Sequence, residues 1–405
     1  MTALRTACCI VGGGPAGMML GFLLARAGVD VTVLEKHPDF FRDFRGDTIH
    51  PSTLEMLSEI GLLDEFLKRP HDELERLSGQ IGSDVVTIGD FSHLPTKCKF
   101  LAFMPQWDFL DFLREQAAVY PTFHLLMQTS FDALVHTDGR VTGIRAKTES
   151  GETLEIAADL VVGADGRHSA VRQQAGLEIE QFGAPMDVLW MRIPMEGAHV
   201  AQTLGYVGNG HVLVLINRNE YWQAGLVIPK GSFEELRTQP IDRLRDTMTD
   251  LAPFLASHVH AITSWDDVHF LQVRVDRLRA WAKPGVLCIG DAAHAMSPIG
   301  GVGINLAVQD AVATANLLWR PLREGKLQLR DLQAVQKRRE FPTVMTQGLQ
   351  RLIQAMIVRR VLRASKITRA PWILRMLTKT RLPRLAARTI GVGFRPERVQ
   401  TPLLK

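Results

Sequence analysis

Two glycine-rich segments have the residue types and spacing that bind an anionic ligand through backbone amides. Gly300, Gly301 and Gly303 end the segment 288–305, and apolar residues at helical spacing follow them. Because glycine lacks a Cβ atom, its backbone turns tightly and its N–H groups can approach a planar or anionic group. A helix that begins at Gly303 would direct its N-terminal amides, which favour negative charge, toward the same place.

The second glycine-rich segment lies near the start of the chain. Gly12, Gly14 and Gly17 satisfy G-x-G-x-x-G between a predicted strand and a predicted helix, and Glu35 ends the next strand. In a dinucleotide site these glycines permit the turn, the close pyrophosphate and the packing of helix on strand, and the acid accepts a ribose hydroxyl. The motif in this context predicts a dinucleotide site in preference to a merely tight turn.

Length and composition predict a cytoplasmic protein of two or three domains or subdomains. The chain has 405 residues, of which 46% are hydrophobic, enough for a large core. We find no apolar run that would span a bilayer, and the first strand begins too early for a signal peptide. Cys8, Cys9 and Cys288 lie in predicted strands and Cys98 has no evident partner, which favours reduced core thiols over a disulfide or metal site.

The positive charge is concentrated at the C-terminus. Residues 350–405 contain 14 Lys or Arg and the single acid Glu397, a local charge of +13 in a chain of +4. An apolar stripe at helical spacing runs among these charges. Two interpretations stay open: a helical layer docked on an acidic body, which we favour, and a helix on an anionic membrane surface. Nucleic acid is not an expected partner, because no recognised module interleaves aromatic residues with these charges.

Hydrophobic periodicity predicts an α/β start, a β-rich middle and a return to α/β near residue 285. A capping box predicts that a helix begins at Ser52, and Gly61 would end it. Two further helices are expected over residues 106–117 and 233–251. Strands are expected over 123–126 and 158–166, in a hairpin across Asp138-Gly139, and through most of 188–275.

This interleaving predicts an α/β fold with a discontinuous Rossmann-like domain and an inserted, mainly antiparallel β-sheet domain. The nucleotide-binding domain is expected to comprise residues 1–75, 101–176 and 281–330, the substrate-binding domain residues 76–100 and 177–280, and a C-terminal basic helical region residues 331–405. The glycines between Gly205 and Gly210 have the wrong spacing for a second dinucleotide motif. A nicotinamide would therefore bind only transiently.

The motifs and their order resemble the FAD-dependent aromatic monooxygenases of group A, which have the para-hydroxybenzoate hydroxylase fold. The resemblance covers about residues 5–330 and includes three separate motifs: the first glycine turn, Asp165-Gly166 and Gly290-Asp291. It implies FAD as the cofactor, a Rossmann-like domain of the GR2 type and NADH or NADPH as a transient co-substrate.

The same resemblance implies a role for each motif. The first turn would bind the FAD pyrophosphate, Glu35 the adenosine ribose, Asp165-Gly166 both FAD and NAD(P)H, and Asp291 the ribityl or ribose portion. The turn from Pro298 would place amides at the flavin pyrimidine ring, Gln106 would reach the phosphate or ribityl, and Arg45 would contact flavin or NADPH. The implied cofactor-binding residues are Gly12, Gly14, Pro15, Ala16, Gly17, Glu35, Lys36, Arg45, Gln106, Asp165, Gly166, Asp291, Pro298, Gly300, Gly303, Ile304 and Asn305.

The implied reaction is the hydroxylation or epoxidation of a hydrophobic aromatic or polyketide-like substrate by NAD(P)H and O2, through a C4a-hydroperoxyflavin. The helix from Gly303 would stabilise the anionic reduced flavin at N1/O2. The family's catalytic tyrosine is marked by no local motif here. Candidates for orienting or deprotonating a phenol are Tyr206, Tyr221, His211 and Arg192, and strand register decides which face each shows.

Other functions stay open. A flavin halogenase or a prenyl-chain reductase would keep the fold and change the reaction, although the Trp-x-Trp-x-Ile-Pro motif of halogenases is absent. A third alternative is a non-enzymatic flavin-binding module that uses the basic tail for peripheral membrane contact or for binding a partner. For His294, which stands alone in the Gly-Asp motif, a structural role is favoured over metal binding. The chain could act as a monomer or a homodimer.

Overall fold

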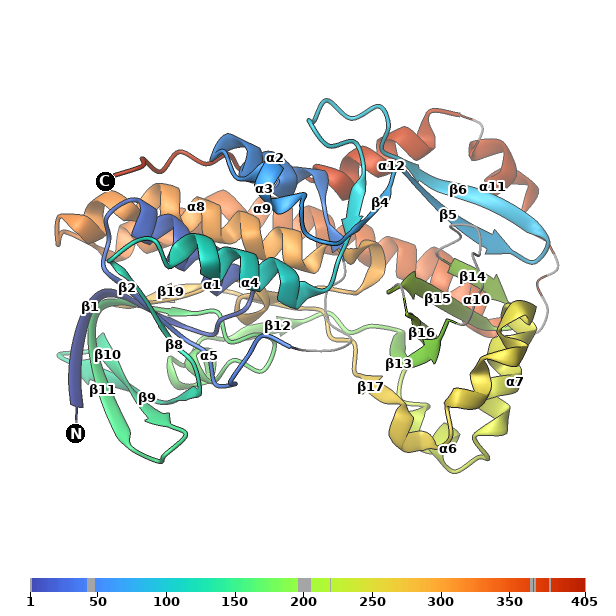
Figure 1. The fold of residues 1–405 in the computed structure, drawn as a ribbon, viewed down its shortest axis with the longest axis horizontal. Coiled ribbons are helices and arrows are strands. Elements are labelled where there is room, and N and C mark those ends of the chain that lie inside the picture. The colour runs from blue at the N-terminus through green and yellow to red at the C-terminus, as the bar shows by residue number, and fades with distance from the viewer. Residues whose placement is uncertain are drawn as a thin grey trace.

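The computed structural model describes residues 2–41, 48–195, 205–218, 220–364, 367, 369–378 and 380–404. One end of the molecule is built on a mainly parallel sheet with the strand order β19-β20-β11-β1-β2-β8 (Figure 1). Only β19 runs antiparallel along this path, and β9 and β10 extend from β11 as an antiparallel hairpin. The strands are β1 (Thr2–Val11), β2 (Val31–Leu34), β8 (Phe123–Leu126), β9 (Thr129–Thr137), β10 (Arg140–Thr148), β11 (Thr153–Gly163), β19 (Ala282–Lys283) and β20 (Val286–Cys288).

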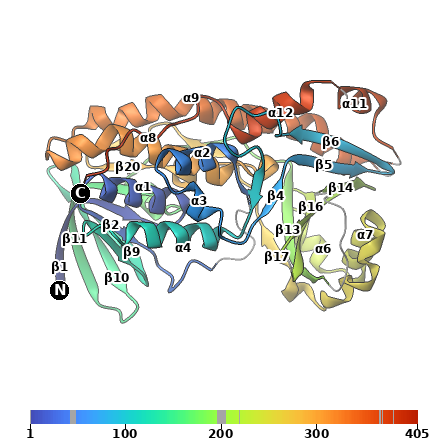
Figure 2. The ribbon, with the colours of Figure 1, turned by 45° about the horizontal axis from the view of Figure 1, so that its top comes forward.

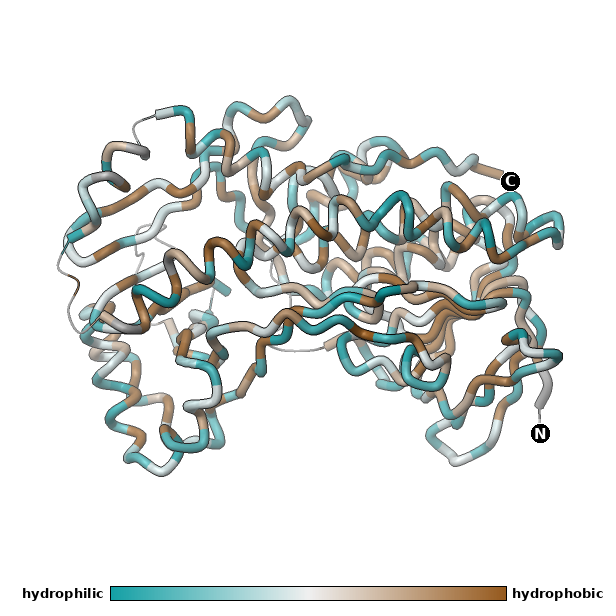
Figure 3. Tube along the Cα trace, turned by 180° about the vertical axis from the view of Figure 1, so that it is seen from behind, coloured by the Kyte–Doolittle hydropathy of each residue, from teal (hydrophilic) through white to brown (hydrophobic). Residues whose placement is uncertain are grey.

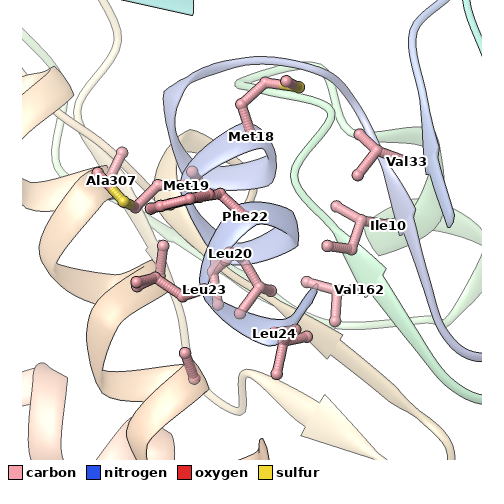
Figure 4. Close-up of a cluster of buried hydrophobic side chains, with 14 of the residues drawn as sticks. Ile10, Met18, Met19, Leu20, Phe22, Leu23, Leu24, Val33, Val162 and Ala307 are labelled. Carbon is pink, nitrogen blue, oxygen red and sulfur yellow. The ribbon is translucent and has the colours of Figure 1, made fainter. Parts of the chain in front are cut away.

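A layer of helices in the order α4-α1-α8-α9 covers one face of this sheet (Figures 1 and 2). They are α1 (Pro15–Arg26), α4 (Gln106–Ala117), α8 (Gly303–Arg323) and α9 (Leu329–Ile353). Helix α1 is apolar around most of its circumference because it packs on the sheet and on α8 together, as Ile10, Val33, Val162 and Ala307 show around it (Figure 4). Both glycine-rich segments therefore begin helices of one layer, which confirms the Rossmann-like part of the expected fold.

The second sheet has the order β17-β13-β16-β15-β14-β5-β6 and is antiparallel except where β14 meets β5. Its strands are β5 (Arg76–Ile81), β6 (Asp84–Asp90), β13 (Met186–Pro194), β14 (Gly205–Gly208), β15 (His211–Asn217), β16 (Tyr221–Pro229) and β17 (His269–Leu271). Helix α7 (Asp242–Leu251) packs on one face. The helix expected over 233–251 is interrupted: α6 (Phe233–Arg237) ends before Pro240, whose ring cannot continue a helix.

Short elements connect the two sheets. The expected capping box at Ser52 is wrong, because α2 (Pro51–Glu59) begins one residue earlier, with Pro51 in its first turn and His50 as an N-cap without a side-chain hydrogen bond. The remaining short elements are β3 (Thr48–Ile49), α3 (Leu63–Phe66), β4 (Asp72–Leu74), β7 (Leu101–Phe103), α5 (Ala170–Gln174), β12 (Ile179–Gln181), β18 (Asp276–Leu278) and β21 (His294–Ala295).

The C-terminal region first follows the second sheet and then returns to the first. Beyond α9, α10 (Arg359–Arg363) and α11 (Trp372–Leu377) lead to α12 (Leu382–Gly391), which packs on β6 (Figure 2). Residues 394–404, here called the strap, then run back over the first sheet's helices. The strap ends at α1, where Leu404 N donates to Arg26 O at 3.0 Å and Arg26 Nη1 to Thr401 O at 2.9 Å.

Hydrophobic residues gather along the strands of the parallel sheet (Figure 3), and most of them are buried. Cys8, Cys9, Cys98 and Cys288 are all buried as free thiols, and burial raises the pKa of Cys98 to about 11. Across the described residues, every helix is too short or too polar to cross a membrane. The boundaries of the nucleotide-binding, substrate-binding and C-terminal segments stay a prediction.

Candidate functional site

Three turns meet where the parallel strands β1, β11 and β20 end. Ala164 N donates to Val11 O at 2.8 Å, and Ile289 N donates to Gly163 O at 3.0 Å. Since parallel strands end at one edge of their sheet, motifs more than a hundred residues apart in the chain become neighbours there. The turn at Gly290 also lies against α1, because a Cβ on Gly290 would be 3.1 Å from the Cβ of Ala16.

The three glycines of the first turn differ in what surrounds them. Gly12 has φ 109°, and a Cβ there would lie 2.5 Å from Ala164 O; a Cβ on Gly17 would lie 2.0 Å from Gly12 O. These two glycines are required by the protein's own packing. A Cβ on Gly14 would meet nothing within 4 Å, so the structure leaves open space at the position that the motif assigns to a ligand.

The first turn of α1 borders this open space. It starts with Pro15, followed by Ala16, and has neither an acidic residue nor a side-chain cap. Its free amides therefore suit an anionic group. Glu35 reaches the same turn from the end of β2: its Oε2 accepts from Gly13 N at 3.2 Å and its Oε1 from His37 N at 3.1 Å.

Lys36 is exposed beside Glu35. Arg45 lies outside the described residues. The cofactor contacts expected of these two residues therefore stay predictions from the sequence.

Asp291 faces a basic side chain that sequence reasoning missed. Arg167 Nη2 lies 3.4 Å from Asp291 Oδ2, and both side chains are 31% exposed. The buried Arg172 supports both turns, because its Nη1 donates to Ala292 O at 3.2 Å and its Nη2 to Arg167 O at 2.8 Å. Both arginines lie in the segment 163–172 that carries the Asp-Gly motif. Their position in this motif is the sequence feature from which they could have been predicted.

Asp165 is turned toward the protein. Its Oδ2 accepts from Val171 N at 3.1 Å, in the first turn of α5. Burial raises the pKa of Asp165 above its usual value, against hydrogen bonds from Ser169 and Val171 that favour the charged form. Gly166 has φ 82°, a conformation that suits glycine. The Asp-Gly motif therefore shapes the turn that presents Arg167.

The second glycine turn is tied to β3 and α2. Gly300 and Gly301 have φ of 80° and 62°, and a Cβ on Gly301 would lie 2.3 Å from Thr48 Oγ1. Pro298 opens the turn at the surface and Ile304 is buried. Helix α8 starts at Gly303 with no side-chain cap and no acid in its first turn. A Cβ on Gly303 would meet nothing within 4 Å, so these amides also border open space.

The side chain of Asn305 is engaged within the protein. Its Oδ1 accepts from His50 N at 2.8 Å and from Thr53 Oγ1 at 2.7 Å, and its Nδ2 donates to Thr48 O at 3.2 Å. It is 3% exposed. Asn305 therefore fixes the turn, and only its backbone amide is left for the expected ligand contact.

Gln106 is half-buried at the first residue of α4. The preceding strand β7 pairs with β3, which contains Thr48. Because Thr48 Oγ1 donates to Gly301 O at 3.1 Å, this small sheet connects the start of α4 with the second glycine turn.

Strand register separates the four candidate substrate residues. Tyr206 is buried on the face covered by α7, with its ring 5.9 Å from that of Phe254, and burial raises its pKa. By strand alternation His211 belongs to the same face, and burial lowers its pKa. The structure therefore places these two away from the glycine turns.

Arg192 and Tyr221 lie on the opposite face, with the Arg192 guanidinium 4.8 Å from the Tyr221 ring centroid. On that face Trp190 packs against a hydrophobic cluster, and Ile299 of the second glycine turn packs against the same cluster. A Cβ on Gly225 would lie 2.8 Å from the Trp190 ring, so Gly225 makes room for the indole. Of the four candidates, Arg192 and Tyr221 share the face that adjoins the turn.

Metal chemistry has no visible centre in the described part of the chain, where no three His, Cys, Asp or Glu side chains are grouped as ligands. His294 instead has its Nε2 2.6 Å from Asp310 Oδ2, deep in the protein. This contact gives His294 a structural partner.

Comparison with known proteins connects this geometry to a family. A model of the FAD binding domain family matches residues 5–348. The chain is similar to 6-methylpretetramide 4-monooxygenase of Streptomyces rimosus, with 32% identity over 99% of this chain and 96% of that protein. Two solved structures share the fold. PqsL, a probable FAD-dependent monooxygenase from Pseudomonas aeruginosa, has a TM-score of 0.74, 23% identity and coverage of 89% of this chain and 97% of PqsL. The p-nitrophenol 4-monooxygenase PnpA from Pseudomonas putida DLL-E4 has a TM-score of 0.75 and 20% identity. The match covers 96% of this chain and 94% of PnpA.

Proposed function

The chain belongs to the FAD binding domain family and is an FAD-dependent monooxygenase, and from this premise we propose that it oxygenates a hydrophobic aromatic or polyketide-like substrate with NAD(P)H and O2. The observation that carries the proposal is the meeting of three turns at one edge of the parallel sheet, with open space at Gly14 in the first turn and with Gly290, the neighbour of Asp291, against Ala16 of α1. FAD, when bound, supplies the redox chemistry that activates O2. The protein's own residues would bind the cofactor, orient the substrate and exclude water.

The open space at Gly14 and the uncapped start of α1 fit a pyrophosphate, which is the group a dinucleotide presents at this position. Glu35, at the same turn, would accept from the adenosine ribose. Asp291 would accept from the ribityl hydroxyls, with Arg167 beside it as its ion-pair partner. The amides from Gly303 to Asn305 would favour negative charge at N1/O2 of the flavin.

We assign the substrate to the face of the second sheet that carries Trp190, Arg192 and Tyr221. An indole and a phenol ring suit a planar, apolar substrate, and Arg192 adds a charge that can orient a phenolate. Trp190 and Ile299 pack against the same hydrophobic cluster, so this face adjoins the turn assigned to the flavin. The relative that acts on 6-methylpretetramide supports a large aromatic substrate.

The test is substrate-stimulated NAD(P)H oxidation by the FAD-loaded enzyme, with a panel of simple phenols and polycyclic phenols under 18O2. One labelled oxygen in the product per NAD(P)H consumed supports the proposal. Product formation that requires halide, or reduction of a prenyl chain without O2, would support the two same-fold alternatives. If neither NADH nor NADPH reduces the bound FAD, the proposal is contradicted altogether.

We also propose peripheral contact with an anionic membrane through one surface of the C-terminal region. Trp372, Met376 and Leu385 are 64%, 61% and 60% exposed on α11 and α12. Arg381, Arg384 and Arg388 lie among them, and Glu397, the one acid after residue 349, is buried elsewhere. Exposed large apolar side chains among arginines complement an anionic lipid surface.

Vesicle flotation of the full-length holoenzyme tests this contact. Binding to vesicles with anionic lipid, lost in Trp372→Ser/Leu385→Ser and kept in Leu403→Ser on the strap, supports it. A change in oligomeric state in the double variant, without vesicle binding by either protein, would assign the surface to a second copy of the chain.

A further inference from the structure

A series of buried charged side chains runs from the Gly290 turn into the helical layer. Asp310 of α8 accepts from Gly290 N at 3.1 Å through Oδ2, which also lies 2.6 Å from His294 Nε2. Its Oδ1 accepts from Arg339 Nε of α9 at 2.9 Å. Burial would raise the pKa of Asp310, yet His294 and Arg339 hold the pKa below its usual value. The charged carboxylate therefore holds the backbone of the residue that precedes Asp291.

The series continues to the strap. Arg339 Nη1 lies 3.6 Å from Glu397 Oε1, and Arg338 Nε donates to both Glu397 oxygens at 2.9 Å. Glu397 N also donates to Gln309 Oε1 at 3.3 Å, next to Asp310 in sequence. The side chains of Asp310 and Arg339 are fully buried, and that of Glu397 is 3% exposed.

Charge balance makes these residues interdependent. A buried guanidinium needs compensating charge, and removal of one partner of a buried pair is strongly unfavourable. Asp310 and Glu397 together balance Arg338 and Arg339. Without the negative charge of Glu397, Arg339 would be compensated by Asp310 alone, in competition with Gly290 N and His294.

The Gly290 turn has little room to adapt. Gly290 has φ 60°, and its Cα sits between α1 and α8, where a Cβ would lie 3.1 Å from Ala16 and 3.3 Å from Ala307. Since Asp291 is the next residue, we expect a change in how Asp310 holds this turn to be transmitted to Asp291.

We propose that Glu397 is a positioning residue for the cofactor, which acts through Arg339 and Asp310 on the Gly290 turn and so on the carboxylate of Asp291. The strap is then a clamp on the FAD site as well as a cover for the helices. This inference rests on the proposed placement of Asp291 at FAD.

The test compares Glu397→Gln with Glu59→Gln in the full chain. Glu59 anchors the same strap, since its Oε2 accepts from Val399 N at 2.8 Å, but it does not touch the buried series. The readouts are the Kd for FAD measured by flavin fluorescence, the visible spectrum of bound flavin, and the melting temperature of the apoprotein. We expect Glu397→Gln to weaken FAD binding about tenfold or more and to shift the flavin spectrum, whereas Glu59→Gln leaves both unchanged.

Equal FAD affinity in Glu397→Gln and wild type, or an equal loss in Glu59→Gln, would overturn the proposal. If Glu397→Gln does not fold, Glu397→Asp replaces it, because it keeps the charge but withdraws the carboxylate from Arg339 by one methylene. Glu397→Asp should weaken FAD binding about threefold or more, and an FAD affinity equal to that of wild type would overturn the proposal. Asp291→Ala separates the two hypotheses: if it weakens FAD and the Glu397 variants do not, only the clamp fails.

Discussion

Arg167 and Asp291, 124 residues apart in sequence, face each other across the turns that follow β11 and β20, with Nη2 3.4 Å from Oδ2. Both side chains are partly exposed, so this pair by itself adds little stability. Because the pair lies where three motifs meet, we expect it to contribute to ligand binding. The pair places a hydrogen-bond acceptor for a ligand hydroxyl beside a cationic donor for a phosphate.

Replacement of Asp291 by alanine should weaken FAD binding about 10- to 100-fold, because a hydrogen bond to a charged group contributes about 1.5–3 kcal/mol. The measurement is FAD affinity of the apoprotein, together with flavin content after purification. Asp159→Asn is the matched control, since Asp159 pairs with Arg5 within the same sheet, four residues before the end of β11. Undiminished flavin content in Asp291→Ala would contradict the placement.

Two glycine substitutions in one turn should affect different properties, the stability of the apoprotein in one case and the affinity for FAD in the other. Gly12→Ala forces an alanine to φ 109° with its Cβ 2.5 Å from Ala164 O, so the apoprotein should unfold at lower temperature. Gly14→Ala meets nothing within 4 Å and has φ −76°, so the apoprotein should melt as wild type. Its methyl group would nevertheless occupy the pyrophosphate space, and FAD affinity should fall about tenfold or more. Melting curves with and without FAD distinguish the two; wild-type FAD affinity in Gly14→Ala would count against the site.

Substrate kinetics should separate Tyr221 from Tyr206. Tyr221→Phe keeps the ring beside Arg192 and removes the hydroxyl, so we expect a lower kcat or poorer coupling of NAD(P)H to product, by about tenfold, with unchanged flavin content. Tyr206→Phe lies on the face covered by α7 and should leave kcat and KM unchanged. Steady-state oxidation assays with product quantification check both; an effect confined to Tyr206→Phe would reverse the assignment of faces.

His50 should make stability fall on acidification. Burial lowers the pKa of His50 to about 4 from an ordinary value of 6.5, so between these values the unfolded chain binds a proton that the folded protein excludes. The stability that depends on neutral His50 is complete above pH 6.5 and declines toward pH 4, by about 2 kcal/mol at pH 5. Urea unfolding of the holoenzyme from pH 5 to pH 8 should show this slope in wild type and not in His50→Asn. Parallel pH profiles for the two proteins would disprove the linkage.

Local patterns predicted much of the cofactor-binding architecture from the sequence. Periodicity and the placement of glycines within short segments predicted the helices that follow the two glycine turns, α1 and α8. The same local patterns predicted the span of α4 at Gln106–Ala117 and the strand at Phe123–Leu126. The order of three motifs also indicated that one ligand site unites them. Such features depend on neighbours in sequence, and the sequence contains those neighbours.

Only the tertiary structure decided which way individual side chains point. Strand register put Tyr206 under α7 and Tyr221 on the opposite face, and a shift of one residue would have exchanged them. Packing turned Asn305 toward His50 and Thr53, and it brought Glu397 of the strap to Arg339 of α9. These contacts join segments 58 to 255 residues apart. Their energies depend on burial and charge compensation that exist only after the layers have assembled.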